Sequence, residues 1–195
     1  MKIIGICGSP RKHKSTYYTL NAALEAAKEA NPDIETEVFD LADKTVAGCT
    51  DCDVCRKKLD CSINDNFKEL IPKLQDTDLA AVIIATPVYM GCMSGQVKAL
   101  LDRSVMFRRN GFLLKDKIGA ALAVGGSRNG GQELAIQAIH AGMLIHDMII
   151  VGDGEKTAHF GGITKSRPDI EEDETGLLTV RNTGKRVAEL AAKIF

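Results

Sequence analysis

The stretch "LAAVIIATPVY", residues 79–89, decides the fold class of this chain. Its first seven residues are all apolar, so both faces of an extended segment here avoid water. Such a strand is typical of the centre of a parallel sheet, because helices cover both faces of that kind of sheet. The Thr-Pro pair that follows ends the strand and opens a loop.

Alternating strands and helices are predicted on both sides of this stretch. The other predicted strands are 2–8, 33–41, the first part of 117–133, and 147–152. The predicted helices are 16–30, 66–75, 94–107, 132–145 and 176–195. Strands that alternate with helices form βαβ units and a parallel sheet. Five strands fit the doubly wound flavodoxin-like order 2-1-3-4-5, an α/β fold whose ligand site lies at the carboxyl ends of the strands. Residues 153–175 hold Gly, Pro and an acidic run, and are predicted to be a solvated loop.

Length and charge narrow the class of protein. With 195 residues the chain is long enough for a full core, and we predict a single domain over 1–195. The formal net charge of −1 provides no electrostatic footprint for nucleic acid or for an anionic membrane. No stretch has the length of a membrane span, and the apolar start at 2–8 is too short for a signal peptide. We therefore expect a cytoplasmic protein without nucleic-acid or membrane partners.

The first loop, "GSPRKHKST" at 8–16, has the donors for a phosphate group. The candidate contacts are Ser9, Arg11, Ser15 and Thr16, together with backbone N–H groups at the start of the following helix. The loop resembles the nucleotide P-loop, but His13 stands where that motif needs its second glycine. The alternative is a polar loop that happens to be basic. The phosphate of FMN needs neither the P-loop lysine nor magnesium, so FMN fits this loop better than a nucleoside triphosphate.

Two further loops, 86–91 and 125–131, are expected at the same edge of the sheet. In the first, aromatic and backbone groups can face a flat ring, and in the second the glycines let the backbone come close to one. The candidates are Pro87, Val88, Tyr89, Met90, Gly125, Gly126, Ser127, Gly130 and Gly131. Neither loop has the G-x-G-x-x-G pattern of a dinucleotide site. A planar ring with one phosphate describes FMN.

The segment "GCTDCDVCRKKLDC", within residues 48–62, holds Cys49, Cys52, Cys55 and Cys61 in the spacing C-x2-C-x2-C-x5-C. A reducing compartment disfavours disulfides. Zinc ribbons place two C-x2-C pairs about 15–20 residues apart, whereas here one short segment holds all four thiols. The spacing starts as the iron–sulfur run of bacterial ferredoxins does, which favours one [4Fe–4S] cluster, with zinc as the alternative.

The remaining chemistry-bearing residues form no second site in the sequence. Arg56 and the two lysines after it are predicted to lie on a solvated face, with docking of an acidic electron carrier as the alternative. Cys7 is expected to pack as a small core residue, and Cys92 is also expected to pack, with contact to the ligand as the alternative. No nucleophile, paired carboxylates or other acid–base constellation stands out, so no catalytic side chain is predicted.

These blocks together resemble the iron–sulfur flavoproteins, a branch of the NAD(P)H-dependent FMN reductase and flavodoxin-like superfamily. The resemblance rests first on "GSPRK" with Ser15 and Thr16, and on the cysteine motif at 49–61. It also rests on three later blocks: "TPVYMG" at 86–91 with Ser94, Gly95, Lys98, Asp102 and Arg103 after it, "GGSRNGGQE" at 125–133, and "HFGGIT" at 159–164. The compact cysteine motif is specific for that branch. The other blocks are shared with related flavin reductases.

The resemblance implies FMN, a [4Fe–4S] cluster on the four cysteines and a homodimer or a tetramer formed from two dimers. It also implies a ferredoxin-type electron donor and a small acceptor such as oxygen or hydrogen peroxide. Two other functions remain open from the sequence. One is an NAD(P)H-dependent FMN reductase with structural or zinc-binding cysteines, and the other is a non-enzymatic electron carrier.

Overall fold

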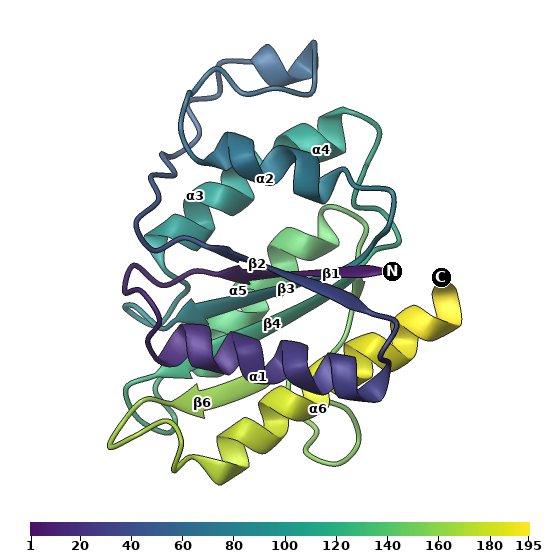
Figure 1. Cartoon of the computed structure of the whole chain (residues 1–195). Helices are drawn as coiled ribbons and strands as arrows, with labels where there is room; N and C mark the ends of the chain where they lie inside the picture. Colours follow the sequence, from purple (N-terminus) through teal and green to yellow (C-terminus); the bar gives the residue numbers. More distant parts are fainter.

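The central sheet has the strand order β2-β1-β3-β4-β5, in a computed structural model that describes residues 1–195 (Figure 1). The strands are β1 (Lys2–Cys7), β2 (Glu35–Asp40), β3 (Leu79–Pro87), β4 (Ile118–Gly125) and β5 (Ile149–Ile150), and all of their pairings are parallel. The flavodoxin-like order predicted from the sequence is confirmed. β3 lies at the centre, and all nine of its residues are buried, as its unbroken apolar run predicted.

One further strand lies in the region predicted as a solvated loop. β6 (Gly162–Lys165) pairs with β4 from Leu122 onward, whereas β5 pairs with Ile118 and Gly119. Both short strands therefore occupy the same edge of β4, one after the other. The prediction of a loop over 153–175 was wrong for β6, because pairing with a distant strand orders these four residues and nothing local does.

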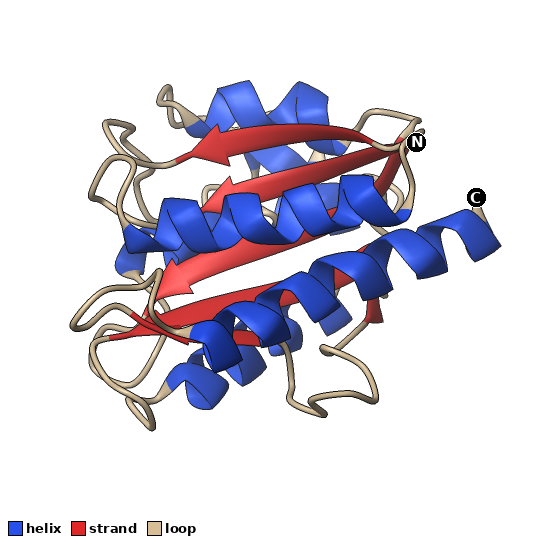
Figure 2. Cartoon of the chain, turned by 60° about the horizontal axis from the view of Figure 1, so that its bottom comes forward, coloured by secondary structure: helices blue, strands red, loops and turns tan.

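Helices cover both faces of the sheet. α1 (Ser15–Ala30) and α6 (Glu174–Ile194) run side by side across one face (Figure 2). At their contact a Cβ on Gly184 would lie 1.9 Å from the carbonyl oxygen of Ala23, so only glycine allows this approach. The apolar positions of α1 that the sequence places on one stripe, such as Leu20 and Leu24, are buried there.

The other face carries α2 (Phe67–Leu74), α3 (Gly95–Arg103), α4 (Val105–Arg109) and α5 (Gln132–Leu144) (Figure 1). The predicted single helix over 94–107 is two helices that meet at Ser104. Its hydroxyl donates to the carbonyl of Leu101 at 2.7 Å and lies 2.7 Å from Nε2 of His146. A serine hydroxyl that bonds back to the preceding turn favours a bend. No helix combines the length and apolar character needed to cross a membrane.

Candidate functional site

The three loops proposed to hold a ligand follow β1, β3 and β4 and are joined by hydrogen bonds. Ser94 is at the centre of this arrangement: its hydroxyl donates to the carbonyl of Gly8 at 2.7 Å, and its N–H donates to Oγ1 of Thr86 at 2.9 Å. The N–H of Val88 donates to the carbonyl of Val124 at 2.9 Å. The loops therefore converge on one edge of the sheet.

Ser94 and Thr86 were not among the predicted site residues. Ser94 also accepts from the N–H of Val97 and so begins α3 as its N-cap. A serine before an apolar helical segment is the sequence signal that could have identified this cap. Its second role, the bond to Gly8, depends on a residue 86 positions away and has no local signal.

The loop after β1 leads into a helix whose first turn has no side-chain cap. Lys14 holds the N-cap position of α1 and makes no capping bond, and the first turn has no acidic residue. Backbone N–H groups at such an end lack intrahelical partners and favour an anion. Ser15 and Thr16 are the first two residues of this turn, and Arg11 is exposed beside it. The predicted phosphate contacts therefore lie together, although Thr16 is buried. Ser9 is buried as well, and its hydroxyl already bonds to the backbone of Arg11.

The loop after β3 forms a tight two-residue hairpin. Tyr89 and Cys92 pair through both backbone bonds, at 2.9 and 3.1 Å, and Met90 and Gly91 between them have φ values of 50° and 74°. The side chain of Met90 is fully exposed and Tyr89 is 43 % exposed. An exposed apolar tip of this kind offers a wall to a flat ring. Cys92 is exposed as well, so the expectation that it packs in the interior was wrong.

The glycines of the loop after β4 divide into two groups. A Cβ on Gly125 would lie 2.3 Å from the amide nitrogen of Gln132, and one on Gly130 would lie 2.9 Å from the carbonyl of Ser127. Gly131 has φ +91° and lies against Gly91. These three are accounted for by contacts within the protein. Only Gly126 faces open space within this loop, and it is the glycine best placed to meet a ligand.

The four clustered cysteines line one cavity, which their segment forms together with residues of α3 and α4. Cys49 and Cys52 are exposed, whereas Cys55 and Cys61 are half-buried against the core. Asp51 and Asp53 have φ values of 48° and 59°, so the backbone is left-handed at two positions between the cysteines. Aspartate accepts this left-handed conformation more readily than most residues. No group of three or more His, Cys, Asp or Glu side chains in the structure is placed to hold a single metal ion.

Each of these four sulfurs has a hydrogen-bond partner of its own. The partners are the N–H of Asp51 for Cys49 at 3.4 Å, the hydroxyl of Ser62 for Cys52 at 2.9 Å, the guanidinium of Arg109 for Cys55 at 3.1 Å and that of Arg103 for Cys61 at 3.3 Å. The bond to Ser62 lowers the pKa of the Cys52 thiol. Burial, in contrast, raises the pKa of Cys7 to about 12, and this thiol packs in the core as predicted.

Arg103 is the buried support of this segment. Its side chain is 1 % exposed, and it contacts Asp65 at 2.6 Å, the carbonyls of Ala47 and Ile63, and the ring of Phe67. Burial by itself lowers the pKa of Arg103, but its bonds to Asp65 and Cys61 outweigh burial and raise it. The guanidinium therefore stays charged beside the sulfur.

Arg109 supports the segment from α4. The hydrogen bond with Cys55 is the largest influence that raises its pKa. The neighbouring Asn110 donates to the carbonyl of Cys55 at 2.9 Å. Arg103 lies in one of the sequence blocks on which the family resemblance rests, but neither Arg103 nor Arg109 and Asn110 was predicted to contact the cysteines. The three residues at 56–58 are exposed, as predicted.

Comparison with known proteins gives the family. Residues 1–162 match the family model described as NADPH-dependent FMN reductase. An iron–sulfur flavoprotein of Methanocaldococcus jannaschii is 46% identical over 100% of this chain and 99% of its own length. An iron–sulfur flavoprotein of Methanosarcina thermophila is 48% identical over 97% of this chain and 95% of its own length. This chain belongs to the iron–sulfur flavoproteins of the NADPH-dependent FMN reductase family.

Solved structures agree with the fold of this iron–sulfur flavoprotein. A WrbA-like flavodoxin of Agrobacterium tumefaciens superposes with a TM-score of 0.68 at 21% identity, covering 98% of both chains. An NADH:FMN oxidoreductase superposes with a TM-score of 0.67 at 22% identity, covering 97% of this chain and 88% of the other. The protein is accordingly an FMN-binding redox flavoprotein and an FMN-dependent oxidoreductase.

Proposed function

We propose that this protein takes single electrons into a [4Fe–4S] cluster held by Cys49, Cys52, Cys55 and Cys61, and uses FMN to deliver two electrons to a small acceptor. When bound, the cluster supplies one-electron transfer and FMN supplies both one- and two-electron chemistry. The single observation that carries the proposal is that all four cysteines line one cavity and each sulfur has its own hydrogen-bond partner.

The spacing of the thiols supports a cluster over a zinc ion. A single zinc ion draws four sulfurs to about 2.3 Å from one point. Here all four thiols come from one short segment, whose spacing starts as the iron–sulfur run of bacterial ferredoxins does, whereas zinc ribbons use two separate C-x2-C pairs. Arg103 and Arg109 add two positive charges on the protein side of the cavity, and these favour the anionic complex that four thiolates form.

FMN is assigned to the edge formed by the three loops. Ser15, Thr16 and the uncapped start of α1 would hold its phosphate, and Tyr89 and the open side of Gly126 would meet its ring. We propose a ferredoxin-type donor and oxygen or hydrogen peroxide as acceptor, in a cytoplasmic protein. Reduction of peroxide is balanced by two electrons and two protons, which yield two molecules of water.

We also propose a homodimer, alone or paired into a tetramer. An apolar groove of about 560 Å³ lies between α3, α4 and α5, and Cys92 and Met93 from the loop after β3 line it. Leu144 and Ile145 beside it are 60% and 61% exposed. A second copy of this chain would cover these side chains and lie next to the flavin loop.

Anaerobic purification followed by assay of iron, acid-labile sulfide and FMN tests the main proposal. We expect about four iron, four sulfide and one FMN per chain. Cys55→Ala should lose the iron and sulfide and retain FMN, whereas Lys57→Ala, which alters an exposed side chain of the same segment, should retain all three. Zinc in place of iron, or absence of sulfide, would overturn the cluster assignment. Steady NAD(P)H oxidation by iron-free protein would favour a plain FMN reductase, the second candidate, which the family description supports.

A further inference from the structure

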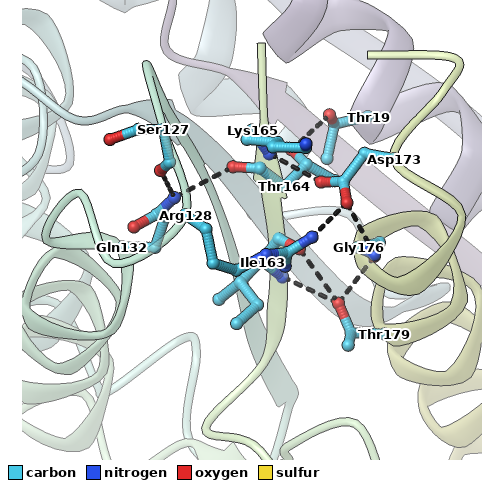
Figure 3. A network of polar contacts seen from close by, with 10 residues as sticks. All are labelled: Thr19, Ser127, Arg128, Gln132, Ile163, Thr164, Lys165, Asp173, Gly176 and Thr179. Carbon is cyan, nitrogen blue, oxygen red and sulfur yellow. Dashed lines mark hydrogen bonds and ion pairs between the residues drawn. The ribbon is translucent and has the colours of Figure 1, made fainter. Parts of the chain in front are cut away.

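The loop after β4 is tied to the chain segment around β6 by buried polar side chains (Figure 3). The guanidinium of Arg128, in this loop, pairs with the carboxylate of Asp173, which precedes α6. Asp173 is 2 % exposed, whereas 39 % of the Arg128 side chain remains exposed. The family match ends at residue 162, so Asp173 lies outside the matched region.

The carboxylate of Asp173 has a fixed orientation. One oxygen accepts from the N–H of Lys165 at 2.7 Å, and the other accepts from the N–H of Gly176 at 3.2 Å in the first turn of α6. Two backbone donors on separate elements therefore hold the carboxylate (Figure 3). Because the carboxylate is buried and the guanidinium is not, Asp173 determines where Arg128 lies.

Gln132 makes a second tie at the other end of the same loop. Its amide nitrogen donates to the carbonyl of Ser127 at 2.7 Å and to that of Thr164 in β6 at 3.2 Å, and its oxygen accepts from the N–H of Gly130 at 2.7 Å. Gln132 is 5 % exposed. Its amide therefore closes the loop on itself and joins it to the sheet.

We propose that Asp173, acting through Arg128, is a positioning residue that holds residues 126–131 in the conformation that receives the flavin ring. This inference rests on the FMN site proposed above. A short loop with three glycines has many conformations to lose, and a ligand that must order it binds more weakly. The Arg128–Asp173 ion pair and the hydrogen bonds of Gln132 order the loop before FMN binds. The C-terminal segment is then part of the flavin site although none of its residues needs to touch the flavin.

Binding of FMN to the apoprotein, followed by the change in flavin fluorescence, tests this inference. Asp173→Asn keeps the size of the side chain and one acceptor oxygen, but it removes the charge and places an NH2 donor against one of the two backbone N–H groups. Arg128→Gln removes the other partner, and Glu172→Gln, an exposed neighbour of Asp173, is the matched control. Loss of one charge-assisted hydrogen bond predicts about tenfold weaker FMN binding for the first two variants. The control should bind as the wild type does.

Three further measurements separate positioning from a general loss of structure. Riboflavin, which lacks the phosphate, should lose affinity by the same factor as FMN, and the visible spectrum of the bound flavin should shift in both variants. The double variant should bind no more weakly than either single one, because the two residues act as a unit. Arg128 is on the surface, so Arg128→Gln carries the test even if Asp173→Asn does not fold.

Unchanged affinity and spectrum in both single variants, with wild type that binds FMN, would overturn the positioning role alone. Losses that add in the double variant would do the same. Wild-type protein that does not bind FMN would overturn the proposed flavin site, and this inference with it.

Discussion

The guanidinium of Arg103 donates to the sulfur of Cys61 at 3.3 Å while it pairs with Asp65 at 2.6 Å. One buried side chain therefore supports a proposed cluster ligand and neutralises a carboxylate that is 7 % exposed. Arg103 belongs to α3, so the cysteine segment is held in place by a residue of the core outside the segment itself.

Arg103→Met should destabilise the apoprotein by about 3 kcal/mol, because it leaves the buried carboxylate of Asp65 without its partner. Urea denaturation gives the free energy of unfolding. Lys98→Met, which breaks an exposed ion pair with Asp102 on the same helix, is the control and should have little effect. Equal losses for the two variants would contradict the role given to Arg103.

Arg109→Gln should lower the midpoint reduction potential of the cluster. A donor to a ligand sulfur favours the reduced, more negative state, so its removal disfavours reduction. A loss of about 1 kcal/mol corresponds to roughly 40 mV for one electron. An EPR-monitored redox titration measures the shift. Arg108→Gln, whose side chain packs over Phe112, removes the same charge one residue away and should shift the potential less.

The stability of the apoprotein should fall as the pH decreases from about 6.5 toward 4, and His140 should contribute to this fall. Burial lowers its pKa from 6.5 to about 4, and its Nε2 has no hydrogen-bond partner. The unfolded chain therefore takes up a proton in this range before the folded protein does, which favours unfolding. His140→Gln should flatten this part of the curve, measured by urea denaturation at several pH values. A His140→Gln variant with the same pH dependence as the wild type would contradict this contribution.

Gly184→Ala should destabilise the protein by about 1–3 kcal/mol, because the new methyl group would collide with the backbone of α1. Thermal unfolding of the apoprotein measures the loss. Gly95→Ala, at the start of α3, meets no atom within 4 Å and should be neutral or slightly stabilising. A stable Gly184→Ala variant would show that α1 and α6 can move apart without cost.

Much of the fold could be predicted because its signals are local. The apolar run of β3 and the helical spacing in α1 each lie within one short stretch of sequence. β6 could not be predicted in the same way, since only its pairing with β4 makes these four residues a strand. The division of the predicted helix into α3 and α4 at Ser104 was not predicted either, because the hydroxyl of Ser104 contacts His146, which is distant in the sequence.

The candidate site also has a part that could be predicted from the sequence and a part that could not. Four cysteines within thirteen positions form a pattern that the sequence displays directly. The arginines that bond to two of them come from 42 and 54 residues further along the chain. Asp173 is 45 residues from Arg128. Groups that support a site from a distance become visible only when the chain is folded.

The shared edge of β4 has a consequence for how this chain can vary. β5 and β6 pair with β4 at separate places, and the chain between them leaves the sheet and returns to the same edge. Residues can be added to or removed from this excursion without shifting the register of any strand pair, because each short strand is aligned by its own bonds to β4. Length differences between related proteins should therefore concentrate here, and a peptide tag or reporter inserted at this point should leave the sheet intact.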